Sequence, residues 1–119
     1  SARALMQRFS LGLGRGLGIL GVTAVFRGKN DLAVDGRKIA GLGVCREAGG
    51  LLFHASLLVD LDVALMARVL RLPGGATDLD DQELAALRTR TTTVREVLGR
   101  AVAMAEVRAR IAAESAGMQ

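Results

Sequence analysis

Aromatic residues are scarce in this chain, which has three Phe and neither Trp nor Tyr among its 119 residues. Its core must therefore be built mainly from Leu, Val, Ala and Ile. The single cysteine, Cys45, excludes an internal disulfide and a thiolate metal cluster. Because such cysteine usage is typical of a reducing compartment, we predict a cytoplasmic setting.

Long apolar runs are missing too. The Leu-rich stretch at 51–66 is interrupted by His54, Asp60 and Asp62, so no run reaches the roughly 18 residues that cross a bilayer. We expect no membrane partner. Half of the residues are nevertheless hydrophobic, which argues against disorder. A chain of this length forms a single domain, 1–119.

Acidic residues are absent from the first 30 positions, where the basic residues are Arg3, Arg8, Arg15, Arg27 and Lys29. Such a start resembles organelle transit peptides, but we favour a place for this stretch in the folded domain. A basic surface permits phosphate binding. Two features argue against a nucleic-acid partner. There is no Trp or Tyr for base stacking, and the net charge of +4 comes from arginines spread along the chain.

Turn signals divide the chain into a helix, several strands and further helices. An apolar stripe predicts a glycine-weakened helix over 2–21, and alternation predicts a strand over 22–27. Asp35-Gly36 is a hairpin signal, because a type I′ turn needs positive φ at both positions. A second turn at 46–50 leads into a strand at 51–59. We therefore predict an antiparallel meander of three strands.

Helices follow the sheet. Asp60 or Asp62 caps a helix that Pro73 stops, and another helix covers 79–87. Thr93 and Glu96 form a capping box that opens one long helix. Its predicted apolar stripe comprises Val94, Val97, Leu98, Ala101, Met104, Ala105 and Ile111.

Strand alternation predicts which side chains share a face. The two later strands present Lys38, Ala40, Leu42 and Val44 on one and Leu52, His54, Ser56 and Leu58 on the other. Near Lys38, Gly41 and Gly43 would let a ligand approach the backbone, and the ammonium offers a compact charge to a phosphate or carboxylate. The residues alone leave a ligand site and a solvated strand lysine equally open.

Two other motifs carry weaker indications. Residues 16–21 match G-x-G-x-x-G, but they end a helical pattern instead of following a strand, so we do not expect a dinucleotide site. Cys45 could act as a nucleophile with His54 as its base. The turn between them does not fix their separation, and a small buried cysteine is the commoner outcome.

One stretch resembles a known family. It reads Lys29-Asn30-Asp31-Leu32-Ala33-Val34-Asp35-Gly36-Arg37-Lys38-Ile39-Ala40-Gly41, then Phe53-His54-Ala55-Ser56-Leu57-Leu58 and, two positions on, Asp60 and Asp62. Lipoate–protein ligases carry a similar R-N-D-L-V-V-D-G-R-K-I-S-G, then H-H-G-S-L-L and an Asp-rich helix start. Octanoyltransferases and biotin ligases belong to the same larger group. The resemblance covers about residues 17–100.

The resemblance implies an α/β (α+β) fold, with an antiparallel-rich mixed sheet and packed helices, as in class II synthetase-like ligase catalytic domains. It also implies ATP-dependent activation of lipoate as lipoyl-AMP, with Mg²⁺, and transfer to a lysine of a lipoyl carrier domain. That carrier would be of the glycine-cleavage H protein or acyltransferase E2 type.

The same resemblance assigns roles to residues. Lys38 matches the catalytic lysine that contacts the lipoate carboxyl and the α-phosphate. Asn30 and Asp31 match a pair near the nucleotide, where Asp31 could help to hold Mg²⁺. The remaining residues implied in substrate or nucleotide binding are Gly41, Gly43, His54 and Ser56.

The chain also departs from the family pattern. Ala40 stands where the family has Ser, and Phe53-His54-Ala55 stands where it has H-H-G. The family's R-R-x-S-G-G-G-x-V-x-H segment is absent and would precede residue 1. We therefore expect the later portion of a catalytic domain, completed by an N-terminal half in another chain or a missing segment. A sheet edge and an apolar face would then be left unpaired.

Three alternatives stay open. Octanoyltransferases share the Lys38–Gly43 pattern and the His strand, but they use a cysteine well after that strand, and no Cys follows Cys45. Biotin ligases share N-D and K-x-A-G without the His strand. A non-catalytic, ligase-like binding module is the third.

Overall fold

The computed structural model describes residues 2–60 and 81–116. Its elements are α1 (Ala2–Leu20), β1 (Val25–Arg27), β2 (Asp31–Val34), β3 (Arg37–Glu47), β4 (Gly50–Leu57), α3 (Asp81–Arg90), α4 (Val94–Leu98) and α5 (Met104–Ala116). The helix predicted between Asp60 and Pro73 falls on 61–80, outside the described residues.

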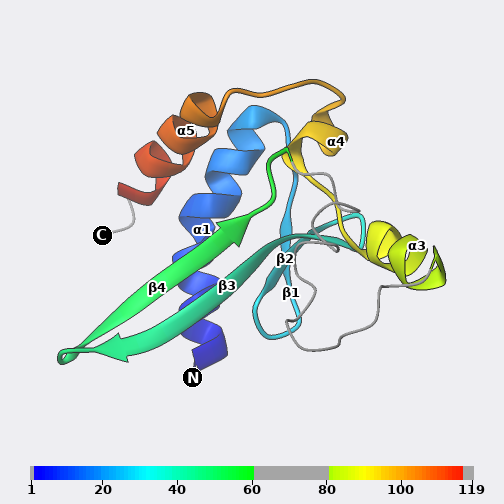
Figure 1. Ribbon diagram of the computed structural model, residues 1–119. Helices are drawn as coiled ribbons and strands as arrows, with labels where there is room; N and C mark the ends of the chain where they lie inside the picture. The colour runs from blue at the N-terminus through cyan, green and yellow to red at the C-terminus, as the bar shows by residue number, and fades with distance from the viewer. Residues whose placement is uncertain (1, 61–80, 117–119) are drawn as a thin grey trace.

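The four strands form one antiparallel sheet in the order β1-β2-β3-β4 (Figure 1). Asp35 and Gly36, with φ of 49° and 78°, join β2 to β3, and Ala48 and Gly49, with φ of 45° and 84°, join β3 to β4. Both turns thus have the two positive φ angles of the type I′ hairpin. The predicted meander is confirmed, and β1 adds a further strand at its edge.

Helix α1 lies against one face of the sheet and packs beside α5 (Figure 1). The buried core draws Leu13, Leu17 and Leu20 from α1, Leu32, Ile39, Ala40 and Leu42 from the sheet, and Val107 from α5. The predicted α/β fold, with helices packed on an antiparallel sheet, is therefore confirmed. Among the helices described, none is long and apolar enough to cross a membrane.

Two glycines of α1 let α5 approach closely. A Cβ at Gly12 would lie 2.7 Å from the Ser115 Cα, and one at Gly16 would lie 2.9 Å from the Ile111 Cα. Both clashes involve backbone atoms, so a side chain at either position would push the helices apart. The G-x-G-x-x-G motif ends this packed helix and does not follow a strand, as predicted.

The long helix predicted from Val94 is two helices. Thr93 caps α4 by accepting a hydrogen bond from the Glu96 N–H at 3.1 Å, as the capping box predicts. Gly99 then ends α4 in the left-handed region, with φ of 71°, a conformation that glycine adopts at little cost. The break rotates the predicted stripe, so that Met104 is 49% exposed while Val107 is buried.

The α1–α5 contact predicts opposite effects for two neighbouring glycines. Gly16→Ala should lower the free energy of unfolding by about 1–3 kcal/mol, because its Cβ overpacks the contact. Gly18→Ala should raise it by about 0.5–1 kcal/mol, since alanine favours the helix and nothing lies within 4 Å of its Cβ. Urea denaturation of the two variants measures both values. Equal effects of the two substitutions would contradict the close contact.

Candidate functional site

A β-bulge decides which way Lys38 faces. Ala40 of β3 pairs with Leu32 of β2, but Lys38 pairs with Ala33, so β3 carries one extra residue between these pairs. An extra residue reverses the alternation of side chains along its strand. The prediction that Lys38 shares the face of Ala40 and the other even-numbered residues of β3 is therefore wrong.

The bulge moves Lys38 to the sheet face that α1 does not cover, the open face. This face carries Asp31, Lys38, Gly41, Gly43, His54 and Ser56. Asp31 pairs with Gly41, which in turn pairs with Ser56, so the row crosses three strands. Six of the seven predicted site residues thus lie together.

Lys38 and Asp31 form an ion pair on this face. Lys38 Nζ lies 3.3 Å from Asp31 Oδ1, and the two side chains are 45% and 28% exposed. The ammonium is therefore held near one carboxylate while solvent, or a ligand, can still reach it. Among the described residues, no group of three or more His, Cys, Asp and Glu is placed to hold a metal. Asp31 could thus contribute a single carboxylate to Mg²⁺.

On the open face, the side chains of Lys38 and His54 lie close to Gly41 and Gly43. The His54 ring lies where a Cβ of Gly43 would be, overlapping it at Cε1 and Nε2. Lys38 Nζ is 3.4 Å from the position of a Gly41 Cβ. A ligand arriving on this face would therefore meet the Lys38 and His54 side chains before the glycine backbone.

Asn30 lies at the rim of the open face, in the turn before β2. Its carbonyl accepts a hydrogen bond from the Leu42 N–H at 2.8 Å, which fixes the main chain at this point, while the residue itself is exposed. The seventh predicted residue is thus next to the other six.

Cys45 is exposed, contrary to the expectation of a buried thiol. It pairs with Leu52, while His54 pairs with Gly43 two positions away. Cys45 and His54 are therefore diagonal neighbours on the open face, a relation that puts Cα atoms roughly 7–8 Å apart. The thiol lies on the open face, although the family pattern assigns no role to Cys45.

Arg37, the residue before Lys38, was missed by the sequence analysis. Its Nη1 donates to Glu96 Oε1 at 2.7 Å, and its Nη2 donates to the carbonyls of Arg88 and Thr91 at 2.7 and 2.6 Å. The hydrogen bond from Arg37 is the main cause that lowers the pKa of Glu96, and a bond from Thr92 adds to it. No local pattern reveals this pair, because 59 positions separate its members.

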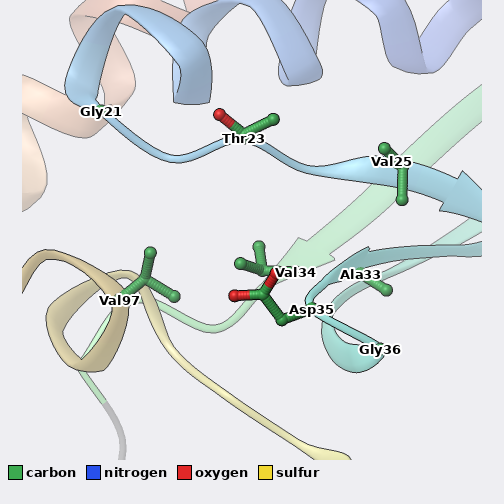
Figure 2. A pocket seen from close by; sticks show the side chains of 8 residues that line it. All are labelled: Gly21, Thr23, Val25, Ala33, Val34, Asp35, Gly36 and Val97. Carbon is green, nitrogen blue, oxygen red and sulfur yellow. The ribbon is translucent and has the colours of Figure 1, made fainter.

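A pocket of about 470 Å³ opens beside the β2–β3 turn (Figure 2). Its walls come from the segment after α1, the β2–β3 turn and α4, and its lining is Gly21, Thr23, Val25, Ala33, Val34, Asp35, Gly36 and Val97. None of these lining residues is basic. The open face carries the Lys38 ammonium beside Asp31, so we take it as the candidate site.

The fold is similar to that of solved lipoate and biotin protein ligases. The bi-partite lipoate protein ligase from Thermoplasma acidophilum, solved with its E2 lipoyl domain, superposes with a TM-score of 0.80 at 24% identity, over 98% of this chain and 45% of that one. Lipoate-protein ligase A bound with ATP superposes with a TM-score of 0.75 at 21% identity, over 99% of this chain and 46% of that one. These similarities concern the fold.

Sequence comparison identifies the family. The model of the lipoyl protein ligase A/B catalytic domain matches residues 1–116, and the chain belongs to this family. Octanoyltransferase LipM of Symbiobacterium thermophilum is 43% identical over 83 residues, 70% of this chain and 30% of that protein. The probable lipoate-protein ligase A of Mycoplasma pneumoniae is 32% identical over 82 residues, which are 69% of this chain and 24% of that protein. The chain thus spans less than a third of either relative.

The overlap at Gly43 predicts that Gly43→Ala displaces His54. Because His54 is the only histidine, its imidazole resonances can be followed without ambiguity in NMR spectra. We expect large shift changes in Gly43→Ala and none in Gly18→Ala, where a Cβ meets open space. Unchanged His54 resonances in the first variant would show that the ring does not lie over Gly43.

The Arg37–Glu96 pair predicts a dependence of stability on pH. The pKa of Glu96 is below its ordinary value of 4.5 in the folded chain, so the pair stabilises the fold above that pH and ceases to do so as the pH falls through the lowered pKa. Because both side chains are partly exposed, the contribution should stay below about 1 kcal/mol. The free energies of unfolding of Glu96→Gln and the parent chain, measured by urea denaturation, should differ at about pH 7. The difference should shrink as the pH falls through the lowered pKa of Glu96, and a constant difference would contradict the linkage.

Proposed function

We propose that this chain is the later portion of a lipoate–protein ligase catalytic domain. The enzyme would activate lipoate as lipoyl-AMP with ATP and transfer the acyl group to a lysine of a lipoyl carrier domain. The observation that carries the proposal is the Lys38 ammonium, held by Asp31 on an exposed sheet face beside Gly41. The family membership of the chain supports the reaction class.

Lys38 supplies the charge that this chemistry needs. In the first step a lipoate carboxylate oxygen bonds to the α-phosphorus of ATP and pyrophosphate leaves, while negative charge builds on the phosphoryl oxygens. A fixed ammonium stabilises that charge. In the second step the acceptor amine attacks the acyl carbonyl and AMP leaves. The same ammonium would polarise the carbonyl and stabilise the developing oxyanion.

Asp31 and Asn30 would orient the nucleotide end of the site. Asp31 keeps Lys38 in place through the 3.3 Å ion pair. A single carboxylate suits Mg²⁺, which binds nucleotides through one or two carboxylates together with phosphate oxygens. The ion would neutralise phosphate charge. Asn30 at the rim would contact the nucleotide.

The other residues of the open face would hold the acyl adenylate. His54 and Ser56 lie on the edge strand β4 and are exposed, so their polar groups are available to a ligand. Gly43 leaves room for the His54 ring, which a Cβ at this position would overlap, so the ligand would lie against that ring.

A second polypeptide segment would complete the site. None of the residues of β4 is buried, and Leu51 and Leu52 are 50% and 51% exposed. An exposed strand edge with apolar side chains is a ready surface for pairing. The solved lipoate ligases are about twice as long as this chain, since the match covers 45–46% of them. We therefore propose that an N-terminal ligase half, in the same or another chain, pairs here.

Octanoyl transfer is the alternative reaction, favoured by the 43% identity to octanoyltransferase LipM and by the exposed Cys45 diagonal to His54. A cysteine would then carry the acyl group as a thioester, and no ATP would be needed. For either reaction we propose a cytoplasmic setting, which the cysteine usage favours.

The test uses the protein in the form in which it occurs in its own cell, with any associated segment. Lys38→Ala should lower lipoyl-AMP formation from ATP and lipoate by about 100-fold or more, as expected when a charge-stabilising group is lost. Lys29→Ala is the matched control, because Lys29 is the other lysine of the chain and lies in an exposed turn.

Three outcomes are informative. Loss of adenylate formation in Lys38→Ala alone supports the ligase. Full activity of Lys38→Ala would remove Lys38 from the mechanism. ATP-independent acyl transfer from an octanoyl carrier protein, abolished in Cys45→Ser, would establish the alternative reaction.

A further inference from the structure

We infer that Arg37 is a positioning residue for Lys38: with Glu96, it fastens the β-bulge of β3 so that the Lys38 ammonium stays on the open face. This inference rests on the proposed function for its catalytic consequence, but the positioning can be measured without any enzymatic activity.

The guanidinium joins three parts of the chain at the start of β3. Arg37 donates to the carbonyl of Arg88 in α3 and of Thr91 in the following segment, and it bonds both oxygens of Glu96 in α4, at 2.7 and 3.3 Å. A planar guanidinium can serve a carboxylate and carbonyls at the same time, which a lysine ammonium does less well.

The segment held by Arg37 is the one that bonds the bulge. Lys38 forms a parallel bridge with Thr91, and its carbonyl accepts from the Thr92 N–H at 2.8 Å. The carbonyl of Ile39, the next residue, accepts from the Leu58 N–H at 2.9 Å. A bulge disrupts the local ladder and leaves backbone groups in need of partners. These contacts supply partners to two of them.

The threonines of this segment make it depend on the Arg37–Glu96 pair. Thr91, Thr92 and Thr93 are 6%, 2% and 5% exposed, and buried hydroxyls need hydrogen-bond partners. Thr92 Oγ1 donates to Glu96 Oε2 at 3.2 Å, and Thr93 Oγ1 accepts from the Glu96 N–H. Glu96 therefore bonds Arg37 and two of the threonines at once.

Loss of the clamp has a specific consequence for Lys38. When the segment at 91–93 no longer fixes the bulge, β3 can return to regular pairing with β2. A one-residue change of register turns a side chain to the opposite face of a sheet. Lys38 would then point toward the side covered by α1 and away from Asp31.

The first readout of the experiment compares the two lysines of the chain, Lys29 and Lys38. The intact protein is treated with a limiting amount of acetic anhydride, and the ratio of acetylation at Lys38 to that at Lys29 is measured by mass spectrometry. Arg37→Ala should change this ratio several-fold, since only Lys38 moves. Arg37→Lys should restore part of the parent value by contacting Glu96 or a carbonyl.

The second readout is catalytic. Arg37→Ala should lower kcat for adenylate formation by about 100-fold, the scale expected for a misplaced reacting group, with little change in KM for ATP or lipoate. Arg95→Ala is the matched control. Arg95 lies on the same helix as Glu96, and within the part of the chain that the structure describes its side chain bonds only the exposed Asp60, at 3.1 and 3.2 Å. It should match the parent protein in both readouts.

The outcomes separate the two proposals. If the parent protein forms no adenylate, the proposed function fails, while the acetylation ratio still decides the positioning of Lys38. An unchanged ratio in Arg37→Ala would overturn the inference, and so would a kcat that falls only with the folded fraction. Should Arg37→Ala fail to fold, Glu96→Gln takes its place, because it keeps an acceptor oxygen without the charge. An acetylation ratio in Glu96→Gln equal to that of the parent protein would then overturn the inference.

Discussion

The extra residue of β3 opposite β2 is the constraint on which the arrangement of this molecule depends. Because of this extra residue, the two ends of one strand face opposite ways. Ala40 and Leu42, beyond the bulge, are buried on the side of α1, while Lys38 turns outward beside Asp31. The bulge has to be held in place, and the backbone N–H groups that bond it come from Leu58 and from Thr92, more than fifty positions after Lys38. Core packing and the candidate chemistry are therefore linked at Lys38 and Ile39.

Glycine has different physical roles in the two halves of the fold. In α1, Gly12 and Gly16 remove side chains so that α5 can pack against the helix backbone. On the open face, Gly43 lacks a side chain, so that the His54 ring can lie against the backbone of β3. The same residue type thus allows close helix packing on one side of the sheet and a close side-chain approach at the candidate site on the other.

Local patterns were sufficient for the parts of the structure that local physics controls. The Asp35-Gly36 turn, the helix at α1 and the Thr93 cap follow from φ preferences, apolar spacing and a side-chain acceptor at a helix start, and all were predicted. The direction of Lys38 was not, because a bulge depends on partners distant in sequence. Glu96 was recognised as part of a capping box but not as the partner of Arg37, for the same reason.

The contact between α1 and α5 has a consequence for the order of folding. Gly12 meets Ser115, so this contact closes nearly the whole described chain into one loop, whereas the β2–β3 and β3–β4 hairpins close through two-residue turns. Closing short loops is fast, and non-local contacts form late. The strands of the meander, including β3 with Lys38, can therefore pair before α1 packs against α5. The sheet that carries the candidate site would then form first, and α1 and α5 would pack together on it.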